Sequence, residues 1–106
     1  MAIDLDQELV AATGQPILDR GPSGEGVVAV TLRAALFGAA QMPLEGDAKL
    51  TLQEKLDLDR VVRRLADQEG PWSPDPEHVV MLRERVNAAY PSPLMVGAIC
   101  AALAGG

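Results

Sequence analysis

Three helix-start signals in the second half of this sequence constrain its fold more than any other feature. The TLQE sequence at 51–54 is a capping box, in which a threonine hydroxyl and a glutamate carboxylate each accept a backbone N–H at a helix N-terminus. The pairs Asp75-Pro76 and Ser92-Pro93 each place a capping residue before a proline at the first helical position. These signals predict three consecutive helices, and Gly70-Pro71 ends the first of them.

Apolar residues recur at helical spacing in the same region and in one earlier segment. The expected core-facing positions are Val28, Leu32, Ala35, Leu36, Ala39, Leu52, Leu56, Leu58, Val62, Leu65, Val79, Leu82, Val86 and Ala89. In the earlier segment we expect a helix over 27–40. Residues 27–30 by themselves also fit a buried strand, and Thr31 would then cap a shorter helix. The sequence leaves both alternatives open.

The N-terminal part is less apolar and contains turn residues. The turn signal at 13–16 separates two short apolar pairs, at 9–10 and 17–18, and predicts a short β-hairpin or a loop packed on the helices. Residues 20–26 contain three glycines and a proline, which predicts a mobile loop. The expected fold class is mainly α (α+β), with an N-terminal β-hairpin or loop followed by a compact bundle of about four helices.

The length of 106 residues supports one domain with one core. Within residues 1–106, we expect the hairpin and mobile loop at 1–26 and helices over 27–106. The 15 acidic and 9 basic residues give a formal net charge of −6, which opposes binding to nucleic acid or anionic lipid. The longest uncharged stretch, 91–106, has fewer apolar residues than the roughly 20 needed to span a bilayer. We therefore expect no nucleic-acid or membrane partner.

No local group of reactive side chains predicts catalysis. His78 is the only histidine, and Asp75 and Glu77 beside it point in different directions around a helix. Cys100 is the only cysteine and lies among alanine and isoleucine, where a thiol acts as a small apolar side chain. The sequence predicts a protein that is not an enzyme, with no catalytic, cofactor-binding or metal-binding residues and no small-molecule substrate. A lone cysteine and an N-terminus unlike a signal peptide favour the cytoplasm.

The final helix, expected from Leu94 to Ala104, has no polar stripe at all. A helix that is apolar all round is covered on all sides, either as a central core helix or by another subunit or partner. The tryptophan in the Gly70–Pro74 connection is either a core residue or an interface anchor. The candidate interface residues are Trp72, Leu94, Met95, Val96 and Leu103. The expected partner is another protein or a second copy of the chain.

Four short segments resemble a group of small proteins of tailed phages and prophages. The segments are Ile3-Asp4-Leu5, Gly14-Gln15-Pro16-Ile17, Glu54-Lys55 and the sequence AYPSPLMVG at 89–97. The resemblance implies a phage or prophage origin, with a role in virion assembly or in modulating a host protein. It also implies a location in the host cytoplasm or in the virion.

These observations lead to one preferred function and two alternatives. The preferred hypothesis is a non-enzymatic phage or prophage protein-binding module, acting as an assembly accessory or minor virion component through its C-terminal helix. The first alternative is a phage-encoded inhibitor of a host or defence protein that uses the acidic surface. The second is a small hydrolase with a site assembled across the fold.

Overall fold

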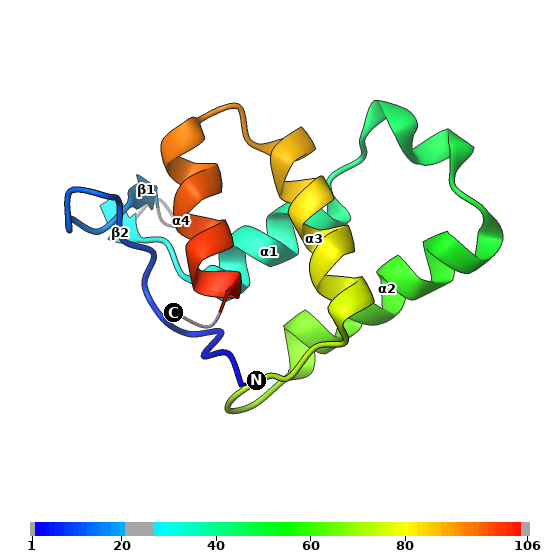
Figure 1. Ribbon diagram of the computed structural model, residues 1–106, viewed down its shortest axis with the longest axis horizontal. Coiled ribbons are helices and arrows are strands. Elements are labelled where there is room, and N and C mark those ends of the chain that lie inside the picture. Colours follow the sequence, from blue (N-terminus) through cyan, green and yellow to red (C-terminus); the bar gives the residue numbers. More distant parts are fainter. Residues whose placement is uncertain (1, 21–26, 105–106) are drawn as a thin grey trace.

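Four α-helices form the molecule in the computed structural model, which describes residues 2–20 and 27–104 (Figure 1). The elements are β1 (Leu18–Arg20), β2 (Val27–Ala29), α1 (Leu32–Gln41), the short 3-10 helix η1 (Glu45–Lys49), α2 (Leu52–Asp67), α3 (Pro76–Ala89) and α4 (Pro93–Leu103). The predicted compact bundle of helices is therefore confirmed. With only three residues each, β1 and β2 do not form a separate layer.

The helix starts lie where the capping signals predict them. The Thr51 hydroxyl accepts the Glu54 N–H at 3.1 Å, and the Glu54 carboxylate accepts the Thr51 N–H at 3.1 Å. Ser92 caps α4 through its hydroxyl, which accepts a backbone N–H. Asp75 occupies the N-cap position of α3, but its side chain makes no capping hydrogen bond. The capping box is thus confirmed in full.

Replacing Thr51 with alanine removes this acceptor and little else. We expect Thr51→Ala to lower the free energy of unfolding by about 1 kcal/mol, the usual value of an N-cap. Thermal unfolding followed by circular dichroism measures the change. Thr13→Ala, at an exposed position in the N-terminal turn, is the matched control and should have the wild-type melting temperature. An equal effect of both substitutions would show that the cap contributes nothing.

Helix α1 lies at the centre of the bundle, with α4 and α2 on opposite sides of it in Figure 1. It packs against α2, α3 and α4, whereas α2 and α3 do not pack extensively against each other. The core is mostly aliphatic, with fully buried leucines from the N-terminal segment and three helices. Its largest fully buried side chains are Leu5, Leu9, Leu32, Leu36, Leu65, Leu82, Ile99, Val61 and Val86.

The core-facing side of α2 differs from the predicted one. Leu65 is buried as predicted and Val61 is buried as well, whereas Leu52 is 74% exposed and Leu56 is 44% exposed. The prediction missed Val61 because the alternative apolar stripe, which runs through Leu52 and Leu56, also fits a helical repeat. Burial against the core is deepest in the second half of α2, so Leu52 and Leu56 remain in solvent while Leu58 is half-buried.

The N-terminal half corrects two further predictions. The predicted hairpin strands meet only at one isolated bridge, between Val10 and Pro16, and β1 pairs instead with β2 in antiparallel register. The helix predicted over 27–40 begins later, because Thr31 is its N-cap and accepts the Ala34 N–H through its hydroxyl. Residues 27–29 form β2, which is the alternative that the sequence left open. The predicted mobile loop at 21–26 lies outside the described residues.

Arg85 of α3 is buried, and its guanidinium binds the end of α1. Its Nε and Nη2 donate to the carbonyls of Ala39 and Ala40 at 3.3 and 3.2 Å, and Nη2 also donates to the Met42 carbonyl at 2.6 Å. Its Nη1 pairs with the Asp47 carboxylate of η1. Carbonyls at a helix C-terminus lack intrahelical partners and carry the negative end of the helix dipole. Arg85 therefore joins α3 to both α1 and η1.

The Asp47 carboxylate is held by two hydrogen bonds. The backbone N–H of Leu44 donates to it at 2.9 Å, and Arg85 donates from the other side. These two hydrogen bonds hold the pKa of Asp47 below its ordinary value of 3.8, and the one from Leu44 has the larger effect. Asp47 therefore remains ionised and paired under all but strongly acidic conditions.

Arg33, at the start of α1, makes a similar contact with the end of α2. Its two terminal nitrogens donate to the carbonyls of Leu65 and Gln68. Its Nε forms an ion pair with Asp6 at 3.1 Å. Arg33 thus caps the C-terminus of α2 and attaches the N-terminal segment to the bundle.

Candidate binding surfaces

His78 and Cys100, the two side chains whose chemistry could support catalysis, lie on different helices. His78 lies in the first turn of α3, and its Nδ1 is 4.0 Å from a carboxylate oxygen of Asp75. Cys100 is a half-buried free thiol on α4. Within residues 2–20 and 27–104, no three His, Cys, Asp or Glu side chains lie together in a way that could hold a metal ion.

A large hollow lies between the end of α2, the 68–75 connection and the start of α3. It has a volume of about 780 Å³ and is lined by three arginines as well as by His78. Arg60 is 3.5 Å from Asp57, and Arg63 is 2.7 Å from Asp59. Asp67 and Asp75 line the same hollow, so its charges are largely balanced. Neighbouring carboxylates therefore offset the basic patch, and it does not form a strong anion site.

A second hollow, here called the acidic groove, lies between η1, α2 and α3 and has a volume of about 430 Å³. Apolar side chains and carboxylates both line it. The apolar residues are Leu44, Leu50, Leu58, Val80, Met81 and Ala88, and the acidic residues are Asp47, Glu54, Asp57, Glu77 and Glu84. Arg85 also contributes to the lining, but it is paired with Asp47.

The structure places the five predicted interface residues in different surroundings. Trp72 and Leu103 are buried in the core of the single chain, with 6% and 3% of their surface exposed. Leu94 is 56% exposed, and Met95 and Val96 are half-buried. Trp72 and Leu103 therefore already have apolar partners within the chain. Of the five residues, Leu94 is the one most available to another molecule, and Met95 and Val96 are available in part.

The exposed side of α4 is apolar, and here we call it the α4 face. Leu94, Gly97 and Ala101 are exposed and lie on one side of the helix at spacings of three and four residues, followed by Ala104 just beyond the helix. Ile99 is fully buried on the opposite side. One side of the helix is therefore core, and the other side faces solvent in the single chain.

The acidic groove was not predicted from the sequence. Val80 and Met81 were outside the expected apolar face of α3, and their presence was a weak signal of a second apolar surface. Glu77 and Glu84 are seven residues apart, which places them on the same side of a helix. No local pattern could show that α2 and α3 diverge here, because that depends on how both helices pack on α1.

Among the described residues, no helix has both the length and the apolar character required to cross a bilayer. Comparison of the chain with protein-family models, with curated proteins and with solved structures found no match.

Proposed function

We propose that this chain is a non-enzymatic protein-binding module that uses the α4 face to contact a protein partner or a second copy of itself. One observation carries the proposal: α4 has no charged residue from Pro93 to Leu103, although one side of it faces solvent. Helices at a protein surface normally have charged or polar residues on their solvent side. Contact with another protein would remove this apolar side from water.

The resemblance to small phage and prophage proteins suggests a biological setting for this contact. In that setting the chain acts as an assembly accessory or a minor virion component. The net charge of −6 and the acidic groove favour a second candidate function, the inhibition of a host or defence protein. Inhibition would also be a binding role, because it requires no catalytic reaction by the chain itself.

The positions of the groups with shifted pKa values favour binding over hydrolysis. Hydrolysis needs at least two reactive polar groups in one pocket, with pKa values adjusted by their surroundings. The pKa of Asp47 is lowered by Leu44 and Arg85, and the pKa of Arg63 is raised by its hydrogen bond to Asp59. Asp47 and Arg63 line different hollows, and each is paired with a structural partner.

A charge placed on the α4 face tests the proposal. An added Cβ at Gly97 meets no atom within 4 Å, so Gly97→Glu fits without strain. Replacing a glycine inside a helix also raises helix propensity by about 0.5–1 kcal/mol, so the variant should be as stable as the wild type. We expect wild-type protein to self-associate or to retain a co-purified partner at micromolar concentration, and Gly97→Glu to weaken this association at least tenfold. Light scattering after size exclusion measures the change.

Two further variants make the result specific. Ala66→Glu adds the same charge to an exposed position of α2 and should leave association unchanged. Ile99→Asp places a carboxylate in the core and should unfold the chain, because a buried unpaired charge is costly. A wild-type protein that is monomeric and without a partner would contradict the proposal, as would equal association of Gly97→Glu and wild type.

A further inference from the structure

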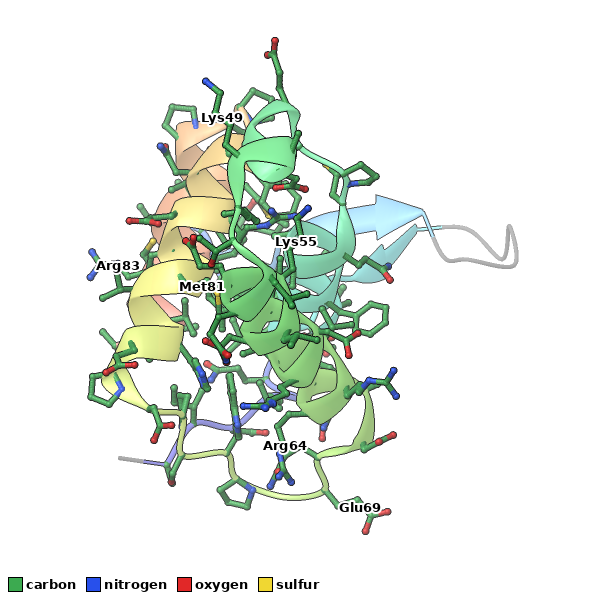
Figure 2. The ribbon with its side chains drawn as sticks, turned by 90° about the vertical axis from the view of Figure 1, so that its right-hand side faces the viewer. Lys49, Lys55, Arg64, Glu69, Met81 and Arg83 are labelled. Carbon is green, nitrogen blue, oxygen red and sulfur yellow. The ribbon has the colours of Figure 1, made fainter. Side chains whose placement is uncertain are left out.

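The acidic groove results from the way two helices pack on a third. Helices α2 and α3 both rest on α1 and do not pack extensively on each other, so their facing sides leave a groove that η1 closes at one end. Figure 2 shows Met81 between the two helices, with Arg83 pointing away on the outer side of α3. The two walls of the groove are therefore helices that are both held in place by packing on α1.

Large apolar side chains form the floor of the groove. Leu44, Leu50, Leu58 and Met81 are half-buried, and Val80 at the border is 56% exposed. These side chains come from η1 and its flanks, from α2 and from α3, so segments that are distant in sequence create one apolar surface. Methionine adapts its shape easily and is frequent at surfaces that bind apolar helices.

The carboxylates around this floor are mostly uncompensated. Asp47 is neutralised by Arg85, and Asp57 lies 3.5 Å from Arg60. In the part of the chain that the structure describes, Glu77 and Glu84 make no ion pair and no side-chain hydrogen bond.

Glu54 adds a further negative charge, since its carboxylate accepts the N–H of Thr51 and has no cationic partner among the described residues. Lys55 lines a neighbouring hollow on another side of α2. The border of the groove therefore carries a net negative charge, and its floor is apolar.

We propose that the acidic groove binds a basic amphipathic segment of another protein. Its apolar side chains would lie on the floor formed by Leu50, Leu58 and Met81, while its lysine or arginine side chains would meet Glu77 and Glu84 on α3. A helix laid into a groove between two helices is a common mode of peptide recognition. Charge complementarity decides the occupant, because a neutral or acidic segment would leave these carboxylates desolvated without a partner.

A second copy of this chain is a poor occupant of the groove. Its net charge is −6, and the apolar α4 has no basic residue to offer the glutamates. Nucleic acid is also unfavourable, since its phosphates would face carboxylates. A partner with both lysine or arginine and leucine-like side chains on one segment satisfies both parts of the groove.

Binding of synthetic peptides tests the proposal directly. The probe is a fluorescent peptide of about 18 residues, long enough to form a helix, with leucines on one face and lysines on the other. One control peptide replaces every lysine with glutamate. A second keeps the composition but scrambles the order, so that the leucines no longer share a face. By fluorescence anisotropy near physiological salt, we expect the lysine peptide to bind at least tenfold more tightly than either control.

Charge reversal of the groove provides the matched protein variants. Glu77→Lys combined with Glu84→Lys should weaken binding of the lysine peptide at least tenfold and strengthen binding of the glutamate peptide. Asp67→Lys combined with Glu69→Lys makes the same change in net charge at the C-terminal end of α2. Figure 2 shows Glu69 at the opposite end of the molecule from η1. That control variant should bind the lysine peptide as the wild type does.

Several results would overturn the proposal. Equal weakening by both charge-reversal variants would mean general attraction to an acidic protein. Equal binding of the ordered and scrambled peptides, or no binding of either, would mean that the groove selects no amphipathic segment. If the groove variant alone changes the oligomeric state without peptide, the groove is a contact between copies of the chain.

This inference is independent of the function proposed for the α4 face. The Gly97→Glu variant should bind the lysine peptide with wild-type affinity, because Gly97 lies outside the acidic groove. The groove proposal can therefore hold if the protein proves monomeric, and the α4 proposal can hold if the peptide does not bind. A peptide affinity that falls in Gly97→Glu would contradict the separation of the two surfaces.

Discussion

Arg85→Met should lower the free energy of unfolding by about 3 kcal/mol, because a buried carbonyl that loses its donor costs about 1–3 kcal/mol and Arg85 serves more than one. Methionine keeps much of the apolar length of the arginine side chain, so the loss reports mainly on the guanidinium. Without it, Asp47 loses its cation and three carbonyls at the end of α1 lose a donor. Urea unfolding followed by circular dichroism measures the difference.

Two other variants calibrate this result. Arg83→Met changes an exposed arginine two residues earlier on the same helix and should alter stability by no more than about 0.5 kcal/mol. Arg85→Lys keeps the charge but cannot reproduce the planar set of donors, so its stability should lie between wild type and Arg85→Met. A loss below about 1 kcal/mol in Arg85→Met would show that water replaces the guanidinium at little cost.

The dependence of stability on pH provides a second measure of the same contact. Because the pKa of Asp47 is lower in the folded chain than its ordinary value of 3.8, its stabilising contribution is complete above that value. The contribution disappears as the pH falls through the lower folded-state pKa. Wild-type protein should therefore lose more stability than Arg85→Met on acidification. The variant keeps the Leu44 hydrogen bond, so part of the dependence should remain.

Trp72→Ala should also destabilise the chain by about 3–5 kcal/mol, as is usual for removing a buried aromatic ring. The Trp72 side chain is 6% exposed and belongs to the core. Its backbone pairs with that of Ile3 through two hydrogen bonds of 2.7 and 2.8 Å, which hold the N-terminal segment against the 68–75 connection. The cavity would open between these two segments. Circular dichroism measures the change, since tryptophan fluorescence is lost.

The matched control is Leu52→Ala, which removes an apolar side chain that is 74% exposed and should change stability by about 0.5 kcal/mol or less. The comparison separates the two roles that the sequence allows for Trp72. Loss of a core residue lowers the stability of the monomer, whereas loss of an interface anchor weakens association. A Trp72→Ala protein with wild-type stability and weaker association would reverse the assignment given by its burial.

The helices were predictable from local sequence because their start signals act within one turn. The capping box at Thr51 and the Ser92-Pro93 pair need only neighbouring residues, and the structure contains the expected helices. The start of α1 was less certain, because Val27 and Val28 suit a strand or a helix equally well. The cap at Thr31 settles the choice, together with the antiparallel pairing of β2 with β1.

The side of a helix that faces the core depends on its neighbours, and local sequence predicts it less well. On α2, the exposed Leu52 and Leu56 fit a helical period with the buried Leu65 as well as the missed Val61 does. The buried role of Arg85 was also missed, since no local pattern distinguishes it from the exposed Arg83. Both outcomes depend on how α2 and α3 lie on α1.

The same limit applies to the candidate surfaces. The uncharged final helix was evident from the sequence, and its exposed residue Leu94 was among those predicted. Trp72 and Leu103 are equally suitable residue types for an interface, but they lie in the core. The acidic groove could not be predicted, because its two walls come from helices that lie next to each other only in the folded chain.

The two arginine contacts at helix ends have a consequence for how the molecule opens. Arg33 belongs to α1 but binds the last turn of α2, and Arg85 belongs to α3 but binds the last turn of α1. Helix ends usually fray locally, at little cost to the rest of a protein. Here the last turn of either helix cannot fray without releasing an arginine from a neighbouring helix. We therefore expect loosening at these ends to spread beyond one helix, so that α1, α2 and α3 open together.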